Sequence, residues 1–484
     1  MKRLPNTFAA IILFCTISAF ASTQTLTTLA NFNGTNGSGS YSALTQGFDG
    51  NFYGTTERGG TSNGGTVFNV TPSGTLTTIY EFCSEANCSD GEYPRGGLAV
   101  GSDRNFYGTT QAGGAKRVGS AFKVTPLGNL TTLHSFCLRE YCGEGDSPIA
   151  GLLLGRDGNF YGTTAYDGTG AYCEYGTCGT LFKITASGTL TGVYKFCSQL
   201  HCSDGGSPEA TLLQDGDGSL YGTTAQGGAN GLGTVFKIAH DGTLATLHSF
   251  DGLDGVFPSA GVVPGPGGSL YGTMGTGGTS DFCLEGCGTA YRITRQGVFA
   301  TENFAGTNGV SPSGLIRATD GNFYGTTYYG GSGTQCDAEY NCGTIFRLTP
   351  QGQITTIYSF CVEAGCTDGF SPDAALVEGT DGNLYGTTSA GGTNNLGTVF
   401  VLNLGLAPFV ETIPTSGNVH ASVAILGTNL TGASSVSFNG TPASFTVVSS
   451  SEITTMVPTG ATTGTVQVTT PGGALLSIVV FGVR

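Results

Sequence analysis

The sequence predicts an all-β protein in which a seven-bladed β-propeller of four-stranded blades is followed by a smaller β-sandwich. Three observations lead to this fold class. The tripeptide Tyr-Gly-Thr recurs seven times at intervals of 50 to 61 residues, which indicates tandem structural units. Short segments that alternate apolar and polar residues fill each unit. The chain also has 83 glycines and only 11% charged residues, a composition typical of a turn-rich globular β protein.

Each unit contains four predicted strands. In the first unit these are residues 41–47, 51–56, 65–71 and 75–82, and the sequences FDGN and TPSG supply two of the turns between them. A four-stranded sheet of about 55 residues cannot bury both of its faces alone. Seven such sheets arranged radially cover one another, which is the arrangement of a propeller.

The two ends of the repeat array complement each other. The segment TLTTLANF (residues 25–32) copies the fourth strand of a unit, whereas the seventh unit ends after its third strand, GTVFVLN (residues 397–403). We therefore expect the N-terminal strand to close the last blade, which leaves no unpaired edge between the termini. A linear solenoid is the alternative, and it would leave both ends of the array incomplete.

The first 21 residues have the features of a secretory signal peptide. Lys2 and Arg3 precede an apolar run over residues 8–20, and Ala19-Phe20-Ala21 fits a signal peptidase site. We expect residues 1–21 to be removed and the mature chain, which has no predicted membrane span, to be secreted or held at the cell surface. The formal net charge of −15 argues against binding to nucleic acid or anionic lipid.

The repeated unit, which reads D-G-N-F-Y-G-T-T and then G-T-V-F-K and G-T-L-T-T-L, resembles the GloVer repeat of the choice-of-anchor tandem-repeat family. The resemblance covers roughly residues 25–403. It implies a bacterial secreted or surface protein, and it brings no catalytic residues. We accordingly place the propeller domain at residues 22–405.

The residue pattern of the sequence changes after residue 405. Residues 406–484 contain neither cysteine nor Tyr-Gly-Thr, and they alternate apolar and polar residues between Gly, Pro and Asn turns. They resemble an IPT/TIG immunoglobulin-like domain through Pro414, Gly427-Thr428-Asn429, Val436-x-Phe438 and Pro471-Gly472. The resemblance implies an immunoglobulin-like β-sandwich that acts as a spacer or an adhesion module.

Of the 15 cysteines, Cys15 lies in the signal peptide, and the remaining 14 form seven local pairs, each within a loop insertion. From the last Phe of a fourth strand to the Gly of the next turn, plain units span five residues and units with a pair span nine. In an oxidising compartment this pattern predicts local disulfides. Zinc ligation is the alternative, but no histidines recur at ligand spacing. The expected disulfides are Cys83–Cys88, Cys137–Cys142, Cys173–Cys178, Cys197–Cys202, Cys283–Cys287, Cys336–Cys342 and Cys361–Cys366.

Connections in an up-and-down blade alternate between two faces, so all of these insertions are expected on one face. Rigid loops clustered on one face favour a binding site there. Aromatic residues beside carboxylates in these loops suit sugar rings and their hydroxyls, so the predicted partner is an extracellular glycan or a surface protein. The alternative is that the aromatics fill gaps between blades. The candidate ligand-binding residues are Tyr93, Tyr141, Tyr172, Tyr175, Phe257, Tyr328, Tyr329 and Phe370.

A catalytic site would need residues that differ between the units. The position after the proline that leads into each innermost strand varies, and it places Arg95, Glu209 and Asp373 at the expected mouth of the central channel. Glu209 and Asp373 are candidates for an acid/base pair, with Arg95 binding an anion. A solvated polar rim is the alternative. We expect neither a cofactor nor a metal ion, since the recurrent Asp-Gly-Asn aspartates fit turn chemistry better than a calcium site.

The sequence thus favours an exported, non-enzymatic recognition or structural protein, expected to be monomeric, that binds an extracellular ligand through its disulfide-bonded loops. The alternative is an extracellular polysaccharide hydrolase or lyase whose site lies at the channel mouth. In such an enzyme the carboxylates would converge within about 10 Å of each other.

Overall fold

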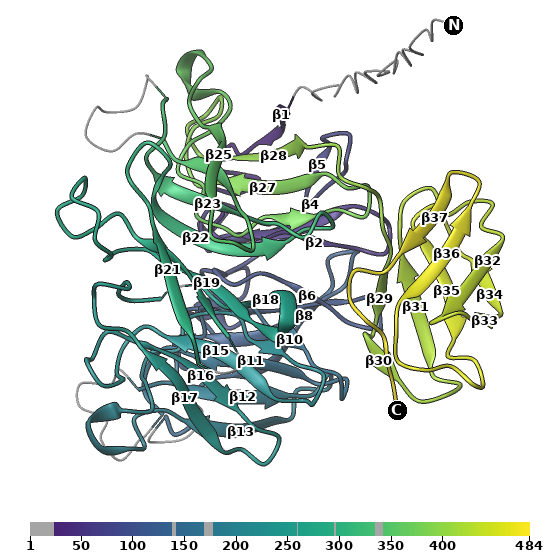
Figure 1. The fold of residues 1–484 in the computed structure, drawn as a ribbon, viewed down its shortest axis with the longest axis horizontal. Helices are drawn as coiled ribbons and strands as arrows, with labels where there is room; N and C mark the ends of the chain where they lie inside the picture. Colours follow the sequence, from purple (N-terminus) through teal and green to yellow (C-terminus); the bar gives the residue numbers. More distant parts are fainter. Residues whose placement is uncertain (1–23, 138–141, 169–177, 259, 295–296, 334–341) are drawn as a thin grey trace, which may run out of the picture.

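The computed structural model describes residues 24–137, 142–168, 178–258, 260–294, 297–333 and 342–484. It confirms the predicted fold class: seven four-stranded antiparallel sheets form a propeller, and a β-sandwich follows them in the chain (Figure 1). Within the described residues, no helix is long and apolar enough to cross a membrane.

The first blade shows how a unit folds. Strands β2 (Thr45–Gln46), β3 (Phe52–Thr56), β4 (Thr66–Val70) and β5 (Leu76–Glu81) pair in sequence order. Asp49 forms the turn between β2 and β3, where its carboxylate accepts hydrogen bonds from the Asn51 backbone and side-chain amides and from the Tyr53 hydroxyl. These hydrogen bonds engage the Asp49 carboxylate within the turn, as turn chemistry predicts.

The second to sixth blades repeat this order. The second consists of β6 (Ala99–Val100), β7 (Phe106–Thr110), β8 (Ser120–Val124) and β9 (Leu130–Ser135), and the third of β10 (Leu153–Leu154), β11 (Phe160–Thr164), β12 (Thr180–Ile184) and β13 (Leu190–Lys195). The fourth consists of β14 (Leu213–Gln214), β15 (Leu220–Thr224), β16 (Thr234–Ile238) and β17 (Leu244–Ser249). The fifth consists of β18 (Val263–Pro264), β19 (Leu270–Met274), β20 (Thr289–Ile293) and β21 (Phe299–Asn303), and the sixth of β22 (Val310–Arg317), β23 (Phe323–Tyr329), β24 (Thr344–Leu348) and β25 (Ile354–Ser359).

The seventh blade joins the two ends of the array. It contains β26 (Val377–Glu378), β27 (Leu384–Thr388), β28 (Thr398–Asn403) and, from the N-terminus, β1 (Thr25–Asn31). β1 and β28 are antiparallel, with Thr25 opposite Asn403 and Asn31 opposite Thr398. The predicted closure by the N-terminal strand is therefore confirmed, and the solenoid alternative is wrong.

Aromatic rings pack each blade against the next. At all seven junctions the ring at the end of an outermost strand meets the third-strand aromatic of the following blade, with centroids 5.0 to 5.5 Å apart. The Phe32–Phe68 pair makes this contact between the seventh and first blades, where Tyr385 also stacks on Phe52 at 3.8 Å. The propeller is thus closed between its seventh and first blades by the same aromatic packing that joins the other neighbouring blades.

The propeller has two unlike faces. The turns between first and second strands and between third and fourth strands form what we call the tight-turn face. The loops between second and third strands and between blades form the opposite, stapled face. The loops of the stapled face include the 3₁₀ turns η1 (Ala86–Cys88), η2 (Leu200–Cys202) and η4 (Ala364–Cys366), whereas η3 (Pro266–Gly268) belongs to a turn of the tight-turn face.

Disulfides staple the loops of the stapled face. Five of the predicted pairs are present, namely Cys83–Cys88, Cys137–Cys142, Cys197–Cys202, Cys283–Cys287 and Cys361–Cys366. Cys178 and Cys342 are also disulfide-bonded. Their expected partners, Cys173 and Cys336, lie outside the described residues. The five local pairs confirm the predicted local pairing of these cysteines.

The C-terminal domain is a sandwich of two four-stranded sheets. One contains β29 (Glu411–Ile413), β31 (Ser422–Leu426), β35 (Glu452–Met456) and β34 (Phe445–Val447), and the other β33 (Thr441–Ala443), β32 (Ser435–Phe438), β36 (Val466–Thr470) and β37 (Gly473–Leu476). β30 (Ser416–Gly417) and β38 (Gly482–Val483) form a short parallel pair. Ile425, Phe438 and Val468 are among the buried side chains of its core.

The sandwich packs directly against the tight-turn face of the propeller (Figure 1). The Ser451 hydroxyl donates a hydrogen bond of 2.8 Å to the Phe48 carbonyl, and Arg104 forms an ion pair with Glu452. Phe48 and Arg104 belong to first-to-second-strand turns of two blades. The sandwich is therefore not a spacer held away from the propeller.

Candidate functional site

The candidate site lies on the stapled face, where the chain enters each innermost strand. In most units a proline precedes this entry, and the glycine that opens the third strand of the preceding blade makes room for it. Gly65 has a φ of +94°, and a Cβ there would collide with the ring of Pro94. Tyr93, just before Pro94, has a φ of 58°. This fixed local geometry directs the residue after the proline, such as Arg95, to one position in each blade.

Arg95 is the centre of a polar cluster built from several blades. Its Nε atom lies 3.3 Å from Oε2 of Glu57, and its guanidinium lies 5.3 Å from the centre of the Tyr41 ring. On the sixth and seventh blades, the Ser313 hydroxyl donates a hydrogen bond of 3.4 Å to Oδ1 of Asp373. Positive charge from Arg95 also reaches the carboxyl groups of both Glu209 and Asp373. We call Tyr41, Glu57, Arg95, Glu209, Ser313 and Asp373 the mouth cluster.

The two carboxyl groups named by the sequence have raised pKa values. Burial raises the pKa of Glu209, although a hydrogen bond with Ser207 and the charge of Arg95 oppose the shift. The dense protein around Asp373 raises its pKa to about 6, while Ser313 and Arg95 again oppose the shift. Asp373 is nevertheless an exposed side chain, so solvent reaches it.

The aromatic candidates divide into four groups. Phe257 is 51% exposed, and Tyr328 and Tyr329 meet edge to face at 4.5 Å near the mouth cluster. Tyr93 is half-buried, with the guanidinium of Arg58 5.1 Å from its ring centre. Phe370 packs against the hydrophobic core of the sixth and seventh blades, which agrees with the gap-filling alternative for this residue. Tyr141, Tyr172 and Tyr175 lie outside the described residues.

Sequence reasoning missed two members of the mouth cluster. Tyr41 occupies the same repeat position as Arg95, but Ser40 stands where the other units have proline, which hides the correspondence. Glu57 directly follows its Tyr-Gly-Thr-Thr sequence, and Tyr328 occupies the same position in the sixth unit. Burial first, then the carboxylate of Glu57, the phenol of Tyr328 and the carboxylate of Asp373, raise the pKa of Tyr41. The residue after Tyr-Gly-Thr-Thr varies between the units, as the residue after the proline does. This second variable position was the signal in the sequence that could have identified Glu57.

Three other aspartates of the stapled face have structural roles. Asp90 accepts hydrogen bonds from the Tyr80 hydroxyl at 2.9 Å and from the Ser84 backbone at 3.0 Å. These bonds hold the stapled loop against the outermost strand of its blade. The corresponding hydroxyl bonds join Tyr194 to Asp204 and Tyr358 to Asp368. These aspartates therefore stiffen the loops and are already engaged within the protein.

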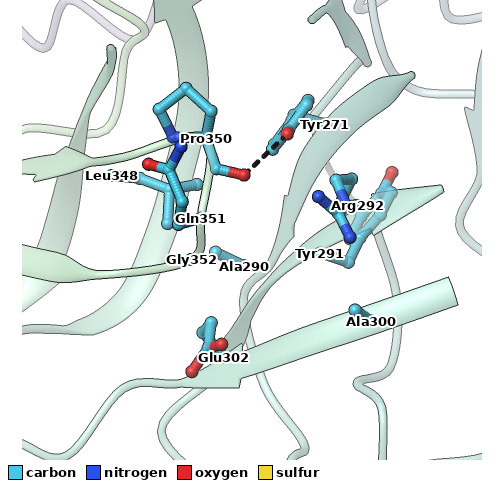
Figure 2. Close-up of a pocket in the computed structure, with 10 residues that line it drawn as sticks. All are labelled: Tyr271, Ala290, Tyr291, Arg292, Ala300, Glu302, Leu348, Pro350, Gln351 and Gly352. Atoms are coloured by element: carbon cyan, nitrogen blue, oxygen red, sulfur yellow. Dashed lines mark hydrogen bonds between the residues drawn. The ribbon is translucent and has the colours of Figure 1, made fainter. Parts of the chain in front are cut away.

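A small cavity between the fifth and sixth blades is a departure from the repeat. Its volume is about 50 Å³. Figure 2 shows ten residues that line it. The fifth unit lacks an Asp-Gly-Asn turn, so the hydroxyl of Tyr271 donates instead to the Pro350 carbonyl at 3.0 Å. Tyr291 stands where other units have phenylalanine, and its buried hydroxyl has no hydrogen-bond partner among the described residues. The cavity is too small for a drug-sized ligand.

Fold and site together define a propeller with disulfide-bonded loops and a polar cluster on one face and a docked β-sandwich on the other. The chain belongs to the Gloeobacter/Verrucomicrobia repeat family, whose sequence pattern matches residues 15–200, 174–284 and 284–427. An IPT/TIG domain matches residues 408–481. Both resemblances expected from the sequence are thus confirmed. No curated protein matches the chain.

Solved structures with a similar arrangement include a gluconolactonase from Xanthomonas campestris, at 14% identity and a TM-score of 0.39 over 64% of this chain and 88% of that one. A putative 6-phosphogluconolactonase from Bacteroides uniformis has 15% identity and a TM-score of 0.43 over 68% of this chain and 85% of that one. At these TM-scores the likeness carries no inference about function. The several disulfides are those of a protein matured in an oxidising, extracellular compartment.

Proposed function

We propose that the protein is exported and non-enzymatic, and that it recognises an extracellular saccharide through the mouth cluster and the stapled loops around it. The observation that carries the proposal is the convergence of Tyr41, Glu57, Arg95, Ser313 and Asp373 from four blades at one place. This place lies on the stapled face, whereas the sandwich covers the tight-turn face.

The chemistry of the mouth cluster suits a polyhydroxylated ligand. Arg95 presents several donors in a fixed plane, while Glu57, Glu209 and Asp373 accept hydrogen bonds from hydroxyl groups. The exposed ring of Phe257 offers an apolar surface for the face of a sugar. Because the disulfides hold the loops in place before the ligand arrives, binding costs less conformational entropy.

A polysaccharide hydrolase or lyase is the second candidate function. The observation in its favour is the raised pKa of both carboxyl groups, since a pKa of about 6 at Asp373 suits a general acid.

A glycan array of the full chain, followed by calorimetric titration of the best ligand, tests recognition. We expect Arg95→Ala to weaken binding by about tenfold or more, because it removes charge-assisted hydrogen bonds. Leu127→Ala, at a residue that is 90% exposed in a turn of the tight-turn face, is the matched control and should bind normally. Absence of any saccharide ligand, or binding unchanged in Arg95→Ala, contradicts the proposal.

The same ligand distinguishes binding from catalysis. Incubation of the bound oligosaccharide with the protein, followed by mass spectrometry, should recover the oligosaccharide intact. Shortened or unsaturated products that disappear with Asp373→Asn or Glu209→Gln would instead establish the enzymatic candidate.

A further inference from the structure

A large cavity separates the sandwich from the lower part of the propeller. Its volume is about 980 Å³, within the range of small-molecule sites, and it is distinct from the mouth cluster on the opposite face. Residues of four neighbouring blades line one side, and the C-terminal segment of the sandwich, residues 478–484, lines the other. In Figure 1 the chain ends on the side of the sandwich that faces the propeller.

Both walls of this cavity carry apolar side chains. Ile478, Val479 and Val480 are 39%, 51% and 49% exposed, an unusual run for three adjacent aliphatic residues in a folded domain. Across from them, the innermost strands β14, β18 and β22 contribute Leu213, Val263 and Ile316, which are partly buried. The apolar run therefore faces other apolar groups across a space that neither domain fills.

Three arginines also line the cavity, Arg156, Arg317 and Arg484. None of them forms an ion pair with a carboxylate in the described part of the chain, although the net charge of the protein is −15. Arg484 donates one hydrogen bond, to the Ser416 hydroxyl at 2.8 Å. Guanidinium groups without a carboxylate partner beside an apolar space are suited to an anionic head group.

The carboxylates of the same cavity are already occupied. Asp157 accepts hydrogen bonds from Asn159 and from the Tyr161 hydroxyl. Asp217 pairs with Lys237 at 3.3 Å, and Asp215 accepts a hydrogen bond from the backbone of Gly216. These aspartates therefore already bind groups of the protein, whereas the three arginines have no carboxylate partner in the described part of the chain, which favours an anion beside the arginines.

We propose that this cavity binds one free amphipathic anion of the alkyl carboxylate class. The alkyl chain lies between Val479 and the apolar ends of β14 and β18, and the carboxylate is held by Arg317 and Arg484. The space lies between two domains and is partly open to solvent, so a single dispersed molecule can enter it. The site does not depend on the saccharide proposal, because it lies on the other face of the propeller.

Calorimetric titration with dodecanoate below its micelle concentration tests this proposal on the full chain. We expect one molecule to bind per protein, and methyl dodecanoate, which lacks the charge, to bind about tenfold more weakly. Binding of dodecyltrimethylammonium at equal strength, no binding of dodecanoate, or capture of dodecanoate-free anionic vesicles at the same surface overturns the proposal.

Variants on each wall separate charge from apolar contact. The double variant Arg317→Ala/Arg484→Ala should weaken dodecanoate binding by about tenfold or more, and Val479→Asp should abolish it. Lys116→Ala and Leu127→Asp are matched controls at exposed positions outside the cavity. Circular dichroism and thermal unfolding confirm that each variant is folded. Unchanged affinity in both cavity variants, or a Val479-dependent dimer in light scattering without dodecanoate binding, contradicts the inference.

Discussion

The two faces of the propeller are built from the same repeated unit, yet they have different chemistry. On the tight-turn face, most of the turns between first and second strands use their own aspartate, as Asp49 does with Asn51 and Tyr53. The stapled face carries insertions, disulfides and the mouth cluster. The difference shows that a repeat tolerates variation where its loops are long, and keeps a nearly uniform surface where its turns are short.

The uniform face is the one that accepts a second domain. Short turns present a regular surface, so the sandwich reaches several blades at once through Ser451, Glu452 and Thr428. The variable face stays open for ligands. Each face also holds one carboxyl group with a strongly raised pKa, Glu411 at the domain interface and Asp373 in the mouth cluster. Variants at the two faces therefore test whether one face is structural and the other functional.

The largest effect is expected from Glu411→Gln at the interface. Burial, and then the nearby Glu378, raise the pKa of Glu411 to about 7. The folded protein therefore holds this proton more tightly than the unfolded chain, and stability falls as pH rises from about 4.5 to about 7. Removal of the charge should raise the free energy of unfolding by about 3 kcal/mol at pH 8 and leave it unchanged at pH 4.

Urea unfolding at the two pH values measures this effect. Glu302→Gln, at an exposed glutamate of the fifth blade, is the control and should change stability little at either pH. An equal gain at pH 4 and pH 8 would show that the charge of Glu411 is not the cause.

A smaller loss is expected from Arg104→Ala. The partner Glu452 is almost fully buried, so the variant leaves a buried carboxylate without its ion pair. Because Arg104 itself is half exposed, we expect a loss of about 2 kcal/mol, less than for a fully buried pair. Calorimetry should show the sandwich unfolding separately from the propeller. Arg58→Ala on the stapled face, where the Arg58 side chain is 54% exposed and lies 3.6 Å from Glu57, should cost less than about 1 kcal/mol.

Removal of one staple should have a modest effect on the fold and a clear effect on the loop. A loop of six residues closed by Cys83–Cys88 stabilises the chain by about 2 kcal/mol at most in the chain-entropy picture. For Cys83→Ser/Cys88→Ser we expect a loss of about 1 to 2 kcal/mol, faster amide exchange confined to residues 84–92 and weaker ligand binding. Exchange that spreads into the strands of the second blade would show that the staple supports the sheet itself.

The smallest change in stability is expected from Asp373→Asn in the mouth cluster. The pKa of Asp373, about 6, lies above the ordinary value, so ionisation of this carboxyl group is less favourable in the folded protein than in the unfolded chain. The stability of the fold therefore falls as pH rises from about 4 to about 6. Because solvent reaches this carboxylate, the gain in the variant at pH 7 should be small and absent at pH 4. Thermal unfolding at both pH values checks the sign, and a loss of ligand binding in the same variant would mark Asp373 as functional.

Much of the fold was predictable from local sequence. The seven Tyr-Gly-Thr units, the copy of a fourth strand at residues 25–32 and the missing strand after Asn403 together specify a closed ring, because each sheet needs a neighbour on both faces. The paired cysteines specify the stapled loops, since partners four to six residues apart close local rings more readily than distant ones. Repeat position also identified Arg95, Glu209 and Asp373 as residues that share one place in three blades.

The tertiary structure alone decided which of these residues meet and what covers the second face. The contact of Arg95 with Tyr41 and Glu57 depends on how neighbouring blades rotate about the axis, and no local pattern encodes that rotation. The same holds for Phe370, which is partly buried against the core of the sixth and seventh blades. The docking of Glu452 on Arg104, 348 residues away in sequence, follows from the complementary shapes of two finished domains, which exist only after both have folded.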